Sequence, residues 1–118
     1  LRLIEIQPAV KNNDPIVCTL TEATFGSKPQ YEALSYMWKK ETADEPILLN
    51  GVPFVVGKNL RDALLFLRRD YKRGSTKTRL LIWIDAICIN QREPQERNRQ
   101  VRIMDQIYFR AQAVVVWL

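Results

Sequence analysis

The clearest pattern of apolar and polar positions lies between Leu80 and Leu118. An apolar run, Leu80–Ile84, ends on Asp85; a polar turn follows, then an amphipathic helical pattern, then a second apolar run, Val114–Leu118. The order strand, helix, strand is typical of a parallel βαβ unit. The second run, VVVWL, predicts a strand that is buried in the sheet.

The first half of the chain contains mostly short apolar runs separated by Pro, Asn and Asp, which is typical of strands and turns. Asn50-Gly51 is the commonest signal for a two-residue hairpin turn, and Val52 would leave one residue of slack. The segment that ends in YEALSYMW is rich in aromatic residues, which favours a strand over a helix. The strands predicted here are Leu1–Ile6, Ile16–Leu20, Tyr31–Trp38, Ile47–Leu49 and Pro53–Val56.

Two segments show helical spacing. After Asn59, a good N-cap residue, apolar side chains recur every three or four residues until Leu67, and Gly74 marks the expected stop. A second helix is predicted to begin around Glu93–Pro94, since Pro is tolerated in the first turn. Its apolar stripe consists of Val101, Met104, Ile107 and Tyr108. These elements predict an α/β domain: a mixed sheet with a parallel βαβ core and an N-terminal β-hairpin region.

Length and composition limit the possible functions. The chain of 118 residues is one domain or part of one, and a buried strand at its last residue suggests a segment cut from a longer protein. It contains no histidine, which excludes Ser–His and Cys–His catalysis. Two cysteines, Cys18 and Cys88, are too few for a structural zinc site or a disulfide framework, so no metal is expected. Cysteines of this kind favour a reducing cytoplasmic location, and no apolar run reaches the roughly 18 residues that span a bilayer.

The net charge of +5 is concentrated in one region, where six cations and a single acid fall between Arg68 and Arg79. Such a patch is either a surface for nucleic acid or a solvated helix end and loop. Only Tyr71 offers an aromatic ring among these cations, so we favour the solvated helix end and do not expect nucleic-acid binding.

Candidate ligand-binding residues follow the predicted strands. Asp85 ends an apolar strand, where it either contacts a ligand or shapes the turn into Ala86-Ile87-Cys88. Cys88, between two isoleucines, is expected to be a small buried hydrophobe. Asn90 and Gln91 follow, and these two residues either cap the next helix or bind a ligand.

Four further residues are candidates with an ordinary structural alternative. Glu96 and Arg97 lie in the first turn of the second helix, where they contact a ligand or form helix-surface pairs. Ser35 and Trp38 close the YEALSYMW segment, where they contact a ligand or pack in the strand and over the core.

Three segments together, YEALSYMW, NLRDAL and LLIWIDAICINQREPQERNRQVRIMDQIYFRAQAVVVWL, strongly resemble the heterokaryon incompatibility (HET) domain of filamentous fungi. The preceding LRLIEIQPA and DPIVCTL resemble the segment that commonly leads into it. The resemblance therefore implies a HET domain over 1–118, with lead-in strands in 1–30 and a core in 31–118. It implies an intracellular signalling domain for nonself recognition and programmed cell death, acting through self-association or a protein partner.

The HET family is thought to be distantly similar to TIR domains, some of which cleave NAD. This relation implies a sheet that is TIR- or flavodoxin-like in part, with Tyr31–Trp38 and Leu80–Asp85 as central parallel strands. It also implies NAD as a possible substrate, with no other cofactor indicated. The TIR catalytic glutamate would lie beyond residue 118, so Asp85 and Glu96 are the catalytic candidates within this chain. We therefore hold three hypotheses for the function, in this order: a signalling module, an NAD nucleosidase and a nucleic-acid-binding module.

Overall fold

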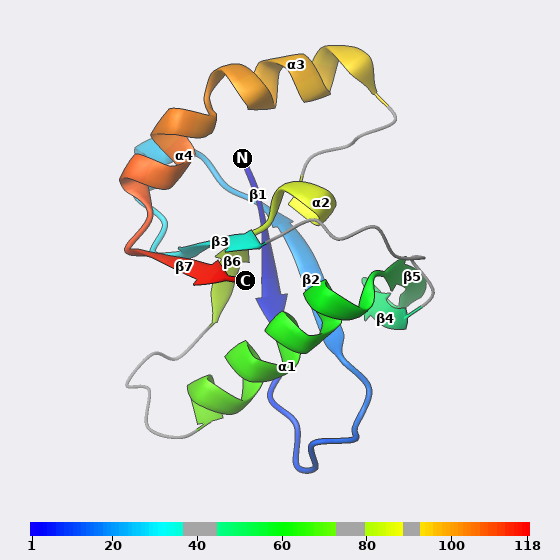
Figure 1. The fold of residues 1–118 in the computed structure, drawn as a ribbon. Coiled ribbons are helices and arrows are strands. Elements are labelled where there is room, and N and C mark those ends of the chain that lie inside the picture. Colours follow the sequence, from blue (N-terminus) through cyan, green and yellow to red (C-terminus); the bar gives the residue numbers. More distant parts are fainter. Residues whose placement is uncertain (37–44, 73–79, 89–92) are drawn as a thin grey trace.

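In the described part of the chain, seven strands form one mixed sheet in the order β5-β4-β2-β1-β6-β3-β7 (Figure 1). The computed structural model describes residues 1–36, 45–72, 80–88 and 93–118. The strands are β1 Arg2–Ile6, β2 Val17–Glu22, β3 Glu32–Tyr36, β4 Glu45–Leu49, β5 Val52–Val56, β6 Leu81–Trp83 and β7 Ala113–Trp117.

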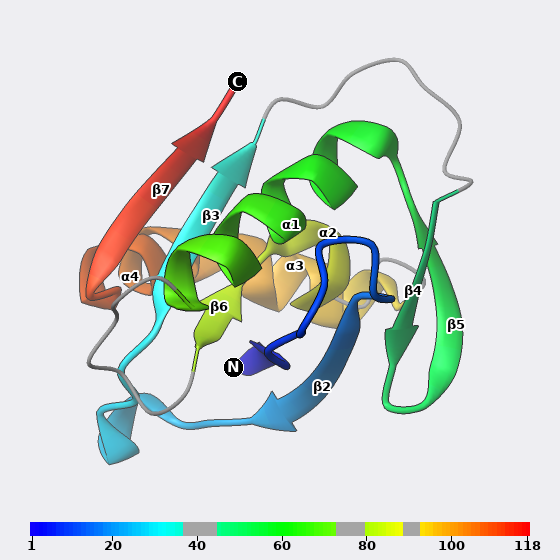
Figure 2. The same ribbon diagram turned by 90° about the horizontal axis from the view of Figure 1, so that it is seen from below.

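Helices cover both faces of this sheet. Helix α1 (Lys58–Lys72) lies across one face, whereas α2 (Asp85–Cys88), α3 (Pro94–Arg102) and α4 (Met104–Arg110) lie on the other (Figure 2). A short 3-10 turn, η1 (Phe25–Ser27), connects β2 with β3. The structure is therefore the predicted α/β fold, with helices packed against a central sheet.

The parallel part of the sheet consists of β6, β3 and β7. Strand β3 pairs in parallel with β6 through Glu32 and Ala33, and with β7 along its whole length. The predicted βαβ unit is confirmed, but its two strands are not neighbours, because β3 lies between β6 and β7. The predicted N-terminal hairpin is also confirmed, since β1 and β2 are antiparallel neighbours.

Residues 1–30 supply two inner strands of the sheet. Strand β1 lies between β2 and β6, and β2 also pairs in parallel with β4. Leu3, Ile4 and Ile6 of β1 are at most 2% exposed and belong to the same core cluster as Trp83 of β6. The lead-in strands and the later strands therefore share one hydrophobic core.

The prediction that the last strand is buried is wrong. Strand β7 is an outer strand with β3 on one side, and the exposed fractions of Val114 and Val116 are 47% and 64%. Only the alternate residues Val115 and Trp117 pack against the core, as the period of two in a strand requires. The reason is topological: β3 takes the position beside β6 that a simple βαβ unit would give to β7.

Two local predictions also need correction. The hairpin turn consists of Asn50 and Gly51 alone, both with positive φ, and Val52 pairs with Leu49, so there is no spare residue. Asn59 is not the N-cap, since α1 begins at Lys58 and the backbone N–H of Arg61 donates to the carbonyl of Gly57. The expected end of this helix at Gly74 lies outside the described residues.

The predicted second helix begins at Pro94 as expected but divides at Ile103 into α3 and α4. Ile103 has φ −101° and ψ 7°, outside the helical region, which changes the helix direction. As a result Ile107 of α4 is fully buried, whereas Val101 of α3 is 54% exposed. The single apolar stripe expected along this helix therefore holds only for its second half.

Candidate functional site

Ser35 and Asp85, two of the predicted site residues, lie at the carboxyl ends of neighbouring parallel strands. Ser35 is near the end of β3, and Asp85 follows β6 as the first residue of α2. In open α/β sheets, ligand-binding side chains collect at this end because several strands deliver residues to the same edge.

Tyr108 of α4 joins these two residues. Burial raises the pKa of the Tyr108 hydroxyl above its usual value, the negative charge of Asp85 raises it further, and a hydrogen bond with Ser35 opposes the shift. The ring of Trp83 packs edge-on against Tyr108, with 5.4 Å between ring centroids and an interplanar angle of 78°. The cluster thus presents two hydroxyls and a carboxylate on an aromatic support.

Tyr108 was not predicted as a site residue, because its spacing assigned it to the apolar stripe of the helix. The available signal was the hydroxyl itself, since a partly buried tyrosine normally needs a hydrogen-bond partner. Ser35 and Asp85 were both predicted, but nothing in their spacing indicated that one helix residue would interact with both.

Cys88 is part of the local framework. It is fully buried, and its Sγ accepts a hydrogen bond from the backbone N–H of Ile84 at 3.3 Å. Burial raises the pKa of the Cys88 thiol to about 12, which keeps it protonated at neutral pH. This agrees with the expectation of a small buried hydrophobe and makes Cys88 a poor nucleophile.

Glu96 has a partner in the first strand. Its carboxylate forms an ion pair with the guanidinium of Arg2, which attaches α3 to β1. Glu96 is half-buried, and the pair joins two elements far apart in the sequence. This contact gives Glu96 a structural role, and its catalytic role stays a prediction.

The remaining candidates lie partly or wholly outside the described part of the chain. Arg97 is in α3, but its side chain is not among the described ones. Trp38, Asn90 and Gln91 lie outside the described residues. The arrangement that the structure brings together therefore consists of Ser35, Asp85 and Tyr108.

The basic region begins with a buried cation. Arg68 is 5% exposed, and its guanidinium donates to three backbone carbonyls in the loop between β1 and β2. These carbonyls belong to Asn12, Asp14 and Pro15. Arg68 therefore fixes this loop to α1 and is withdrawn from any surface that nucleic acid contacts.

These features define an α/β domain with a polar cluster at the carboxyl ends of its parallel strands. Comparison with known sequences gives the family: the pattern described as heterokaryon incompatibility protein (HET) matches residues 31–118. The chain belongs to the HET family. The resemblance to the HET domain is thereby confirmed.

A curated relative supports the same assignment over the whole chain. The chain is 35% identical to "Heterokaryon incompatibility protein 6, OR allele" of Neurospora crassa, over 100% of its own length. It spans 18% of the length of that protein. No solved structure matches the chain. Among the described residues, no helix combines the length and apolar character that crossing a membrane requires.

Proposed function

We propose that this chain is the signalling module of a fungal incompatibility protein, which recognises nonself and triggers programmed cell death. The observation that supports the proposal is the family match over 31–118, together with 35% identity to a Neurospora crassa protein named for heterokaryon incompatibility. Because the chain corresponds to 18% of that protein, the activity of a whole protein of this kind is part of the proposal.

The outer strand β7 supports self-association as the way the module acts. Among the described residues, β7 pairs only with β3, so the N–H and C=O groups along its other side have no strand partner. The strand is AVVVW, with no charge and no proline. Natural outer strands usually carry a charged residue or a proline, because these residues prevent pairing with another chain. A strand without them accepts an added strand readily.

A second copy of the chain fits this edge by symmetry. If two β7 strands pair antiparallel about Val115, Val114 faces Val116 of the second copy, and Ala113 faces its Trp117. No like charges are brought together, which matters for a chain of net charge +5. The two-fold arrangement also covers the exposed side chains of Val114 and Val116.

The module is placed in the cytoplasm as part of the same proposal. Both cysteines, Cys18 and Cys88, are free and buried, as expected for a reducing compartment. Nothing in the described residues or in the comparisons favours NAD cleavage or nucleic-acid binding over signalling.

The proposal is tested by inducing the chain in a filamentous fungus and scoring cell death with a viability stain. We expect death with the wild-type chain and with Val55→Glu, a matched substitution on the other outer strand, and survival with Val116→Glu. Survival with the wild-type chain would overturn the signalling proposal. Death with Val116→Glu, in cells where that variant is monomeric, would overturn self-association through β7 and leave signalling intact.

A further inference from the structure

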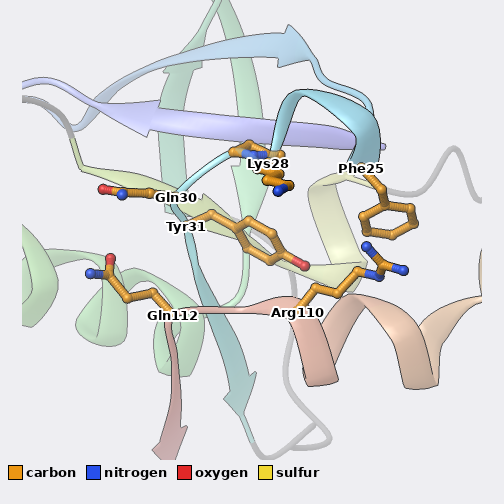
Figure 3. A pocket seen from close by; sticks show the side chains of 7 residues that line it. Phe25, Lys28, Gln30, Tyr31, Arg110 and Gln112 are labelled. Atoms are coloured by element: carbon orange, nitrogen blue, oxygen red, sulfur yellow. The ribbon is translucent and has the colours of Figure 1, made fainter.

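A hollow of about 380 Å³ opens at the amino ends of β3 and β7 (Figure 3). Tyr31 directly precedes β3 and Gln112 directly precedes β7, so this hollow lies at the opposite end of the parallel strands from Ser35 and Asp85. Its size is within the range of small-molecule sites. The residues around it are Phe25, Lys28, Pro29, Gln30, Tyr31, Arg110 and Gln112.

The charged groups around the hollow are all positive. Lys28 and Arg110 come from segments far apart in the sequence, and no carboxylate is among the lining residues that the structure describes. In the part of the chain that the structure describes, neither cation forms an ion pair. Two cations that share a cavity without a counter-charge repel each other, and an anion between them removes that repulsion.

Arg110 is held in position before any ligand binds. Its guanidinium lies over the ring of Phe25, 5.0 Å from the centroid, and its Nε donates to Oε1 of Gln106 at 3.4 Å. Figure 3 shows the guanidinium next to the Phe25 ring. A side chain fixed in this way loses little rotamer freedom on binding, which favours affinity for an anion.

Lys28 occupies an unusual backbone conformation. It ends the η1 turn with φ 50° and ψ 56°, in the left-handed region, where its N–H donates to the carbonyl of Phe25. Glycine and asparagine are the residues that adopt this conformation easily, and for other residues it costs about 1 kcal/mol. The Lys28 side chain is one of those that line the hollow.

The floor of the hollow is rigid. The hydroxyl of Tyr31 donates to the carbonyl of Ile107, and the backbone N–H of Gln112 donates to the carbonyl of Tyr31 at 2.7 Å. The Tyr31 side chain is 1% exposed, and burial raises the pKa of its hydroxyl, so the floor stays neutral. Phe25 and Pro29 add apolar surface beside the two cations.

We propose that this hollow binds a small organic anion, with its carboxylate or phosphate between Lys28 and Arg110 and its apolar body against Phe25 and Pro29. The proposal does not depend on the signalling function. Five of the seven lining residues, Phe25 to Tyr31, lie before or at the start of the family match, which begins at residue 31. Most of the hollow therefore lies outside the part of the chain that the family pattern covers.

The test is a titration of the ¹⁵N-labelled chain followed by NMR, with benzoate, phenyl phosphate and the neutral isostere benzamide as probes. We expect both anions to produce saturable shifts in the amides of residues 25–31 and 110–112, and benzamide to produce none at equal concentration. The anion that binds with the higher affinity shows whether the hollow prefers a carboxylate or a phosphate. Equal affinity for benzoate and benzamide would overturn the proposal.

Substitutions then test the two cations. Lys28→Gln and Arg110→Gln should each weaken anion binding about fivefold or more, as expected for the loss of one charge-assisted contact. Lys11→Gln removes the same charge from the exposed loop between β1 and β2 and should change the affinity less than about twofold, since only screened long-range attraction is lost. The dispersed amide spectrum confirms the fold of each variant. Unchanged affinity in both folded pocket variants would overturn the proposal, as would equal losses in all three.

Discussion

The two outer strands of the sheet, β5 and β7, differ in how far their free edges allow pairing with a further strand. Among the described residues each has one neighbouring strand, and both expose valines: Val52 and Val55 in β5, Val114 and Val116 in β7. In β5, the pair Leu49–Val52 closes the hairpin turn, and Pro53 is the next residue. At this position in the strand, a backbone N–H would point away from β4. Proline has no N–H, so β5 lacks a donor where a further strand would need one. Strand β7 has no such residue.

The outer strands are also joined to α1 in different ways. Next to β7, the indole Nε1 of Trp117 donates to Oδ1 of the buried Asn59 at 3.1 Å, and the Trp117 ring packs on Phe66. At the other edge, the connection is an ion pair of 3.6 Å between Glu45 and Arg61, with about a third of each side chain exposed. Among the described residues, β7 is therefore held to α1 by a partly buried hydrogen bond and has no strand on its outer side, whereas β5 is held by a partly exposed ion pair and lacks one outward donor.

The largest expected effect is the loss of self-association in Val116→Glu. A carboxylate at this position must lose water when it faces Val114 of a second copy, which costs more than the pair gains. We expect the dimer dissociation constant to rise about tenfold or more, equivalent to about 1.4 kcal/mol. Sedimentation equilibrium of the 118-residue chain measures it.

Val55→Glu is the matched control for this experiment. Val55 is 52% exposed on β5, so the substitution adds the same charge at a comparable position on the other edge. Association should be unchanged in this variant. A wild-type chain that is monomeric at all concentrations, or equal weakening by both substitutions, would contradict the difference between the edges.

The next effect concerns the connection of β7 to α1. Asn59→Ala removes the acceptor of the Trp117 indole N–H, and we expect it to lower the free energy of unfolding by about 1–2 kcal/mol. Urea unfolding measures this change, in the Val116→Glu background so that association does not add to stability.

Glu45→Gln provides the comparison at the other edge. An ion pair this exposed contributes little, and we expect a loss below about 0.5 kcal/mol. If Asn59→Ala and Glu45→Gln lower the free energy of unfolding equally, the two edges are attached to α1 equally well. That result would contradict the difference between β5 and β7.

A smaller effect is expected at the turn that forms β5. Gly51 has φ +78°, and a Cβ at this position meets no atom within 4 Å. Gly51→Ala should therefore destabilise the chain by about 1 kcal/mol through backbone strain alone. Gly26→Ala is the control, because Gly26 has no positive φ and its added Cβ meets only Thr24 Oγ1 at 3.9 Å. Urea unfolding of both variants distinguishes strain from a general cost of losing glycine.

Much of this fold was predictable because its signals are local. The turn Asn50-Gly51, the start of α3 at Pro94 and the apolar run of β6 depend on neighbouring residues, and each is found where the sequence indicates it. The insertion of β3 between β6 and β7 was not predictable, since it depends on pairing between distant segments. For the same reason, the position of β7 at the edge of the sheet was not predictable from its own residues.

The residues of the candidate site were likewise predictable only where their signal is local. Ser35 and Asp85 were predicted from their places at strand ends, a rule that holds for open α/β sheets in general. Tyr108 and the Arg2–Glu96 ion pair were missed, because each joins residues brought together only by tertiary packing. Asn59 was misread as a helix cap for a related reason: its actual partner, Trp117, lies 58 positions away.

The smallest expected effect tests whether Pro53 is what closes β5. Pro53→Val restores an outward N–H on β5 without adding charge, so the strand becomes VVFVV and resembles β7 in composition. In the Val116→Glu background, where β7 no longer pairs, we expect weak concentration-dependent association through β5, with a dissociation constant a few-fold lower than in the parent. Sedimentation equilibrium detects this difference. Adding Val55→Glu should abolish it, because the charge then lies on the reopened edge. No association in Pro53→Val would mean that the missing donor is not what protects β5.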